Sequence, residues 1–131
     1  MDFILRLEET FVDELNVNFV FEYLPGQDLF WILSNEHNLN LGKDKQRKDL
    51  VLFYCAEILC ALDTLHSRHI IYRDMKPDNV MIDYAGHIKL IDFGFAKQLS
   101  ERNNFRTKTN CGTIGYTAPE ILLGLTQGYS F

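Results

Sequence analysis

The chain has 131 residues, of which 47% are hydrophobic and 24% charged, values that are ordinary for a globular protein with a packed core. Its net charge of -5 and the lack of a basic stripe argue against nucleic-acid binding. The three cysteines show no CxxC spacing, which predicts neither a disulfide framework nor a zinc site and favours a reducing compartment, the cytoplasm or the nucleus. The sequence also predicts no membrane span and no secretory signal, because no apolar run is long enough.

Two β-rich runs, residues 3–11 and 17–24, are joined by polar residues and predict a β-hairpin. Pro25-Gly26 then break the second strand. Residues 27–33 predict a short amphipathic helix with Asp28 near its amino end, where the helix dipole favours an acid. Taken alone, the two β-rich runs fit core strands of another fold better, and the alternative for Asp28 is a helix-start acid with no ligand.

Residues 34–49 are polar and predict a surface linker. Its basic residues, which fit a solvated loop better than a docking patch, are Lys43, Lys45, Arg47 and Lys48. Residues 50–66 are apolar on nearly every side and predict a buried central helix. Cys55 and Cys60 are expected to be small core residues in this helix. Packing beneath the loop that follows is expected for Leu59, Cys60, Leu62 and Leu65.

Two polar clusters flank a second predicted hairpin. Residues 80–83 and 87–90 are short β-rich runs, and Gly86 between them suits a tight turn. Because paired strands lie about 5 Å apart, we expect Asn79, before the first strand, to meet Asp92, after the second. An amide oxygen and a carboxylate together suit Mg²⁺, which takes oxygen ligands and keeps waters for substrate phosphates.

Asp74 and Lys76 lie a few residues before Asn79 on the same predicted loop. A carboxylate can orient an attacking hydroxyl and accept its proton, and a lysine beside it offers positive charge to a phosphoryl group in transfer. These residue types at this spacing indicate phosphoryl transfer. The alternative is a structural hairpin beside a coincidental polar loop.

Three motifs resemble those of eukaryotic protein kinases and occur in that family's order. The string YRDMKPDN at 72–79 resembles the catalytic loop, DFG at 92–94 the metal-binding tripeptide, and APE at 118–120 the third marker. The resemblance implies an α+β, protein-kinase-like fold that is present in part. Residues 1–24 would hold the last strands of the amino-terminal lobe and the hinge, and residues 25–131 the first half of the helical carboxy-terminal lobe.

Tyr72 before Arg-Asp, the string DFGFAK, and TNCGT at 109–113 resemble the AGC group of serine/threonine kinases, closest to cyclic-nucleotide-dependent kinases. The resemblance implies transfer of the ATP γ-phosphate to serine or threonine hydroxyls of basic protein substrates. ATP and Mg²⁺ are the expected cofactors, and a regulatory subunit or domain is a further expected partner.

By this resemblance, Asp74 accepts the proton, Lys76 contacts the γ-phosphate and Thr113 orients both. Asn79 and Asp92 would hold Mg²⁺. The expected contacts to ATP are Phe21, Glu22, Leu24, Asp28, Lys76, Asp78, Asn79, Met81 and Asp92.

Asp28 and Asp78 are also expected to meet a substrate arginine, although Asp78 is one methylene shorter than the usual Glu. Ile114-Gly115 replace the Pro-Glu of close relatives, so the surface that receives the residue after the phosphoacceptor is expected to prefer different peptides.

Thr109 takes the place of the activation phosphosite, with Arg73 and Lys97 as the basic pair that receives the phosphate. Phosphate there is expected to order residues 98–113, a polar stretch with little apolar surface to bury. The alternative is an unmodified loop threonine.

The chain contains no Gly-rich loop and no strand lysine for the ATP phosphates. Since phosphoryl transfer depends on positioning, we expect the 131-residue chain to have little activity alone and to expose apolar surface on its central helix. A truncated, non-catalytic kinase-like module that docks partners or regulatory subunits is the alternative from another class. A small-molecule phosphotransferase is a third.

Overall fold

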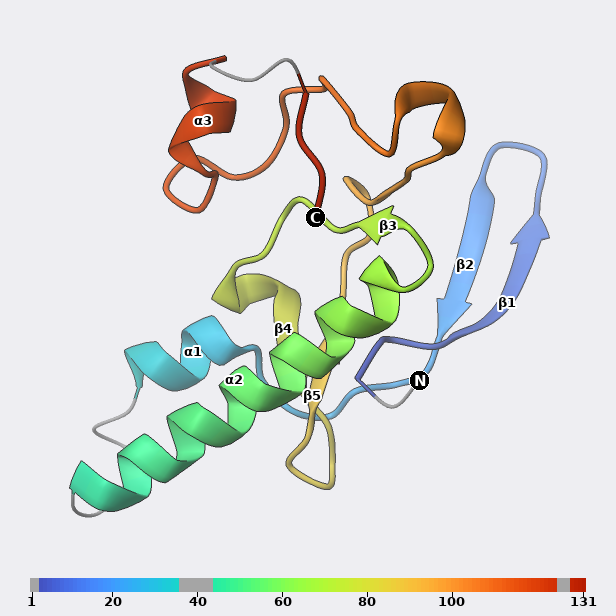
Figure 1. Ribbon diagram of the computed structural model, residues 1–131. Coiled ribbons are helices and arrows are strands. Elements are labelled where there is room, and N and C mark those ends of the chain that lie inside the picture. The colour runs from blue at the N-terminus through green and yellow to red at the C-terminus, as the bar shows by residue number, and fades with distance from the viewer. Residues whose placement is uncertain (1–2, 36–43, 125–127) are drawn as a thin grey trace.

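The computed structural model describes residues 3–35, 44–124 and 128–131, and Figure 1 shows how their elements are arranged. The strands are β1 (Leu7–Val12), β2 (Val17–Phe21), β3 (Ile70–Ile71), β4 (Val80–Ile82), β5 (Ile88–Leu90) and β6 (Lys97–Gln98). The helices are α1 (Leu29–Ser34), α2 (Asp44–His66) and α3 (Pro119–Leu122), with 3-10 turns η1 (Pro77–Asn79) and η2 (Glu101–Asn103). The strands pair as β1-β2, β3-β6 and β4-β5, all antiparallel. The expected α+β class is confirmed.

The first predicted hairpin is confirmed as β1 and β2. Asp13 stabilises its turn, because its Oδ1 accepts hydrogen bonds from the backbone N–H groups of Leu15 at 2.9 Å and Asn16 at 2.8 Å. In Figure 1 this hairpin projects away from the helices, and most of its side chains are exposed.

The second predicted hairpin, β4-β5, is also confirmed and lies at the centre of the chain (Figure 1). Its turn is stabilised by Asp83, whose Oδ1 accepts from the N–H groups of Ala85 and His87, while Gly86 adopts the φ of 87° that favours glycine. Short extended segments flank both edges: the Leu90 N–H donates to the Phe3 carbonyl at 2.9 Å, beside β5.

On the other edge, the chain between β2 and α1 passes close to β4. The Ile82 N–H donates to the Gln27 carbonyl at 3.1 Å. A Cβ on Gly26 would lie 1.9 Å from the Ile82 carbonyl oxygen, so only glycine fits there. Asp28 then caps α1, as its Oδ1 accepts from the Trp31 N–H at 2.7 Å.

The hydrophobic core lies between one face of α2 and the β4-β5 hairpin. Ile88 and Leu90 of β5 are both 0% exposed. The core cluster comprises Ala61, Leu65, Tyr72, Val80, Ile82, Ile88 and Leu90. This packing fixes the hairpin, and with it the two loops at its open end.

The structure corrects the sequence-based view of α2 in two ways. The helix begins at Asp44, so Lys45, Arg47 and Lys48 belong to it and not to a linker; Lys43 lies outside the described residues. The prediction of burial on all sides was wrong, since Cys55, Cys60 and Leu59 are exposed. The expectation that this 131-residue chain exposes apolar surface on its central helix is confirmed. The physical reason is that the described elements pack against one face of the helix only. Of the four residues expected beneath the loop, Leu65 is buried in the core and Leu62 packs against it.

None of the described helices is long and apolar enough to cross a membrane.

Candidate active site

The loop between β3 and β4 carries most of the expected catalytic residues, and Tyr72 anchors it. The Tyr72 hydroxyl donates to the Ile91 carbonyl at 2.5 Å, and its ring lies edge-on to Phe93 with centroids 5.4 Å apart. Burial, followed by the charge of Asp92, raises the pKa of Tyr72 well above its usual range, so the phenol stays a hydrogen-bond donor. The loop before β4 is thereby tied to the segment that follows β5.

Arg73 and Asp92 both adopt backbone angles in the left-handed region, with φ of 74° and 55°. Such a conformation costs a non-glycine residue about 1–2 kcal/mol and is typical of functional sites. The Arg73 Nε donates to the Phe95 carbonyl at 2.6 Å, which joins the two strained segments.

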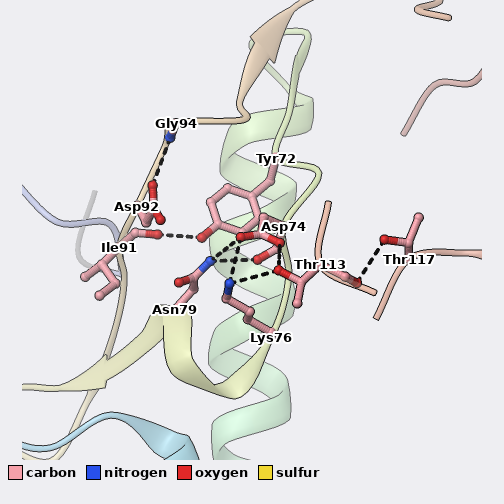
Figure 2. A network of polar contacts seen from close by, with 9 residues as sticks. All are labelled: Tyr72, Asp74, Lys76, Asn79, Ile91, Asp92, Gly94, Thr113 and Thr117. Atoms are coloured by element: carbon pink, nitrogen blue, oxygen red, sulfur yellow. Dashed lines mark hydrogen bonds and ion pairs between the residues drawn. The ribbon is translucent and has the colours of Figure 1, made fainter. Parts of the chain in front are cut away.

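Asp74 is buried and receives hydrogen bonds from three side chains (Figure 2). The Thr113 hydroxyl donates to its Oδ1 at 2.6 Å, the Asn79 Nδ2 donates to its Oδ2 at 3.0 Å, and the Lys76 Nζ lies 3.1 Å from the same Oδ2. The Thr113 hydroxyl also accepts from Lys76 at 2.9 Å. One hydroxyl therefore orients the carboxylate and the ammonium group together.

These contacts set the charge of Asp74. Burial alone raises the pKa of this carboxyl, but the hydrogen bonds from Thr113, Lys76 and Asn79, with the charge of Lys76, outweigh it and hold the pKa below its ordinary value. Asp74 is therefore ionised at neutral pH. Because a low pKa makes a weak base, the geometry suits a group that orients a substrate hydroxyl and accepts its proton late.

Asn79 and Asp92 present oxygen atoms beside this network. The Asn79 Nδ2 donates to both the carbonyl and the carboxylate of Asp74, so its amide oxygen faces away from Asp74 (Figure 2). The Ile91 N–H donates to the Asn79 carbonyl at 3.0 Å, which brings the following Asp92 close. Asp92 accepts from the Gly94 N–H through Oδ1 at 3.0 Å. This pair of oxygen donors fits Mg²⁺, which is commonly held by one or two protein oxygens plus water and phosphate.

A cavity of about 750 Å³ lies between the β1-β2 hairpin and the open end of β4-β5. Its lining is mainly apolar, as is common for sites that bind an aromatic ring. It includes the expected ATP contacts Phe21, Glu22, Leu24, Met81 and Asp92, together with Leu5, Phe19, Tyr23, Ile91, Phe93 and Gly94. Leu5 and Phe19 were missed because no local motif marks them.

The other expected ATP contacts lie outside this lining. Lys76 and Asn79 belong to the Asp74 network, and Asp78 is exposed in η1. Asp28 uses one carboxylate oxygen to cap α1, which supports the plain helix-start role, although its backbone forms a β-bridge with Met81, which lines the cavity.

Neither of the two expected basic residues, Arg73 and Lys97, is linked to Thr109 directly; each is linked to it through the hydroxyl of a third residue. The Lys97 Nζ donates to the Thr107 hydroxyl at 3.0 Å, and this hydroxyl donates to that of Thr109 at 3.3 Å. Arg73 lies 3.5 Å from the Tyr129 hydroxyl, which donates to the Thr109 carbonyl.

The structure also assigns a supporting contact to Thr117, which the sequence did not indicate. Its hydroxyl donates to the Thr113 carbonyl at 3.0 Å and so braces the residue that orients Asp74 (Figure 2). A Cβ on Gly112 would lie 2.8 Å from the Thr117 hydroxyl and 3.0 Å from the Arg73 carbonyl. Gly112 was the one local sign that two segments pass close together here.

A model of the protein kinase domain matches residues 1–131. The chain belongs to the protein kinase family. The expected kinase-like fold, present in part, is confirmed with it. Curated relatives are serine/threonine kinases, which agrees with the resemblance of the motifs.

Three relatives illustrate the similarity of this kinase chain. The serine/threonine-protein kinase YPK2/YKR2 of Saccharomyces cerevisiae is 44% identical over 128 residues, which are 98% of this chain and 17% of the relative. The cAMP-dependent protein kinase catalytic subunit PRKX of Homo sapiens is 46% identical over 126 residues, 96% of this chain and 32% of the relative. The cAMP-dependent protein kinase catalytic subunit of Dictyostelium discoideum is 43% identical over 126 residues, 96% of this chain and 18% of the relative. The chain thus spans well under half the length of these relatives.

Proposed function

We propose that this chain carries the phosphoryl-transfer site of an AGC-type serine/threonine protein kinase, which moves the ATP γ-phosphate to hydroxyls of basic proteins. The observation that carries the proposal is the closed network of Asp74, Lys76, Asn79 and Thr113. A non-catalytic docking module has no physical need of a buried, ionised carboxylate held by three side chains. The division into a hinge-containing part, 1–24, and a helical part, 25–131, belongs to the same proposal.

In this mechanism Asp74 orients the substrate hydroxyl. Its depressed pKa keeps it ionised, so it can accept a hydrogen bond from the hydroxyl and then its proton as the oxygen–phosphorus bond forms. Lys76 lies 3.1 Å from the carboxylate and offers its charge to the oxygens of the group in transfer. The Thr113 hydroxyl bonds to both Asp74 and Lys76 and so fixes their relative positions.

Protein kinases as a family use ATP and Mg²⁺, and the residues present fit both groups. The cavity beneath β1-β2 would take the adenine, with Met81 below it, and the oxygens of Asn79 and Asp92 would hold the metal. The bound nucleotide supplies the phosphoryl group, and the metal neutralises charge that develops on it.

The proposed preference for basic substrates rests on two acidic residues, Asp28 and Asp78. Asp78 is exposed in η1, directly before Asn79, and Asp28 bridges β4 through its backbone. We assign both carboxylates to a substrate arginine, which a carboxylate binds strongly; one oxygen of Asp28 already caps α1. Thr109 is the proposed activation phosphosite, with Arg73 and Lys97 as receivers, since each is linked to Thr109 through one hydroxyl.

The test is a phosphate-transfer assay with the purified native gene product and labelled ATP. A serine peptide flanked by arginines is compared with the same peptide carrying alanines in their place. We expect Mg²⁺-dependent transfer to the first peptide, a loss of at least about 100-fold with Asp92→Asn, and little change with the exposed Asp63→Asn as a matched control. Absence of transfer by the wild type, or equal transfer by Asp92→Asn, would overturn the proposal.

A further inference from the structure

Residues 128–131 lie across the segment that contains Thr109. Tyr129 and Thr107 form two backbone hydrogen bonds of 2.9 Å each, and the Ser130 hydroxyl donates to the Phe105 carbonyl at 2.8 Å. Residues 105–107, just before Thr109, are therefore attached to residues 129–130 by three hydrogen bonds.

The side chain of Tyr129 extends this attachment to the catalytic loop. Its hydroxyl donates to the Thr109 carbonyl and accepts from the Arg73 guanidinium at 3.5 Å. Burial raises the pKa of Tyr129, so the hydroxyl keeps its proton for the Thr109 carbonyl. Arg73 is itself fixed by the Phe95 carbonyl and directly precedes Asp74. A shift of Arg73 would therefore be felt at the catalytic carboxylate.

Lys97, like Arg73, is linked to Thr109 through a single hydroxyl. Its Nζ donates to the Thr107 hydroxyl, which donates to the Thr109 hydroxyl. A phosphate on Thr109 would add close to two negative charges and three acceptor oxygens. It could then contact the two basic groups directly, because only one hydroxyl separates each of them from Thr109. The Tyr129 hydroxyl, which contacts Arg73 in this structure, would then no longer be needed to hold it.

We propose that Tyr129 is a positioning residue that holds the Thr109 segment against Arg73 while Thr109 is unphosphorylated, and that the phosphate takes over this role. The inference rests on the proposed kinase function and names how its site is regulated. It gives the unphosphorylated enzyme a basal activity that depends on one tyrosine hydroxyl. In the phosphorylated enzyme that dependence is lost.

The experiment compares the native gene product with Tyr129→Phe, which removes the hydroxyl and keeps the ring. Each protein is assayed after phosphatase treatment and after full phosphorylation of Thr109. We expect Tyr129→Phe to lower kcat of the unphosphorylated form by roughly three- to tenfold, the effect of one hydrogen bond, and that of the phosphorylated form by less than about twofold. Tyr84→Phe, at a hairpin-turn position that is 89% exposed, is the matched control and should change neither form.

A second readout needs no activity. In the unphosphorylated protein, Tyr129→Phe should speed hydrogen–deuterium exchange in peptides that cover residues 105–111, and Tyr84→Phe should not. An equal loss of activity in both phosphorylation states would show a merely structural tyrosine and overturn the inference, as would unchanged activity in both. If the wild type transfers no phosphate in either state, the proposed function fails, and the exchange data alone decide whether Tyr129 holds the segment.

Discussion

The polar site around Asp74 and the apolar outer surfaces of this chain differ in how fully their side chains are partnered: by hydrogen bonds in the site, and by packing on the surfaces. In the described parts of the chain, no buried side-chain nitrogen or oxygen lacks a hydrogen-bond partner. Apolar side chains of the β1-β2 hairpin and of the outer face of α2 are, by contrast, widely exposed, among them Phe19 and Leu59. The polar groups of the site find hydrogen-bond partners within the chain. The apolar surfaces, by contrast, have no described element packed on them.

The difference follows from the range of the interactions. Asp74, Lys76 and Asn79 lie within six residues of chain, and the β4-β5 turn returns Asp92 to them, so few long contacts are needed. An apolar face is buried only when another element lies on it. The hydrogen-bond network of the site can therefore form in a chain in which the outer face of α2 is exposed.

The largest expected effect tests the site directly. Asp74→Asn keeps the shape of the side chain but removes the proposed proton acceptor, so we expect kcat of the native gene product to fall by about 10²- to 10⁴-fold. The measurement is steady-state kinetics with ATP and a basic serine peptide, with the melting temperature as a check of folding. Asp63→Asn, on the exposed side of α2, is the matched control. Retention of full activity by Asp74→Asn would remove Asp74 from the chemistry.

The second prediction compares the buried and the exposed apolar regions by the same substitution. Leu90→Ala removes a side chain that is 0% exposed, and the resulting cavity should lower the free energy of unfolding by about 2–5 kcal/mol. Leu59→Ala, at a position 66% exposed, should change it by about 0.5 kcal/mol or less. Denaturant unfolding of the 131-residue chain measures both. A large cost for Leu59→Ala would mean that the outer face of α2 is covered in solution.

The third prediction concerns the residue that joins Asp74 and Lys76. Thr113→Ala removes one hydrogen bond to each, and we expect kcat to fall by about 10- to 100-fold. Since the lost bond stabilises the ionised carboxylate, the pKa of Asp74 should rise, and the acidic limb of the kcat/KM profile should move to higher pH. Thr113→Ser keeps the hydroxyl and should restore both values. An unshifted acidic limb in Thr113→Ala would contradict this account.

Much of the site was predictable because its signals are local. The β-rich runs around Gly86 predicted the hairpin, and the hairpin brought Asn79 and the segment of Asp92 together. The position of Asp28 just before an apolar run predicted the start of α1. In each case the residues that decide the structure are neighbours in the sequence.

What the sequence could not predict depends on distant partners. Tyr129 meets Arg73 across 56 positions of the sequence, and no spacing rule connects them. The apolar pattern of α2 indicated a buried helix, but a pattern shows only which faces can be buried. Leu59 and Cys60 are exposed because no described element packs there.

The smallest expected effect lies between the polar site and the apolar outer surface of α2, at the contact of α2 with the turn of β4-β5. Glu57 is buried, its Oε1 lies 2.6 Å from His87 Nδ1, and its Oε2 accepts from the Ile88 N–H at 2.9 Å. The hydrogen bond with Glu57, then the charges of Glu57 and Asp83, raise the pKa of His87 above its ordinary 6.5. Because the folded pKa is raised, the ion pair contributes its full stability below about pH 6.5. That contribution is lost as the pH rises through the higher folded pKa.

Glu57→Gln removes the charge and keeps an acceptor for the Ile88 N–H, so it isolates the ion pair. We expect the wild type to melt at a higher temperature than Glu57→Gln at pH 6, and the difference to shrink by pH 9. Glu14→Gln, in the exposed turn of β1-β2, is the control and should show no such dependence. Equal melting temperatures of the wild type and Glu57→Gln at both pH values would mean that Glu57 stabilises the hairpin through the Ile88 N–H alone. In that case the boundary between α2 and the site hairpin would be held by a backbone contact, with no role for the charge of His87.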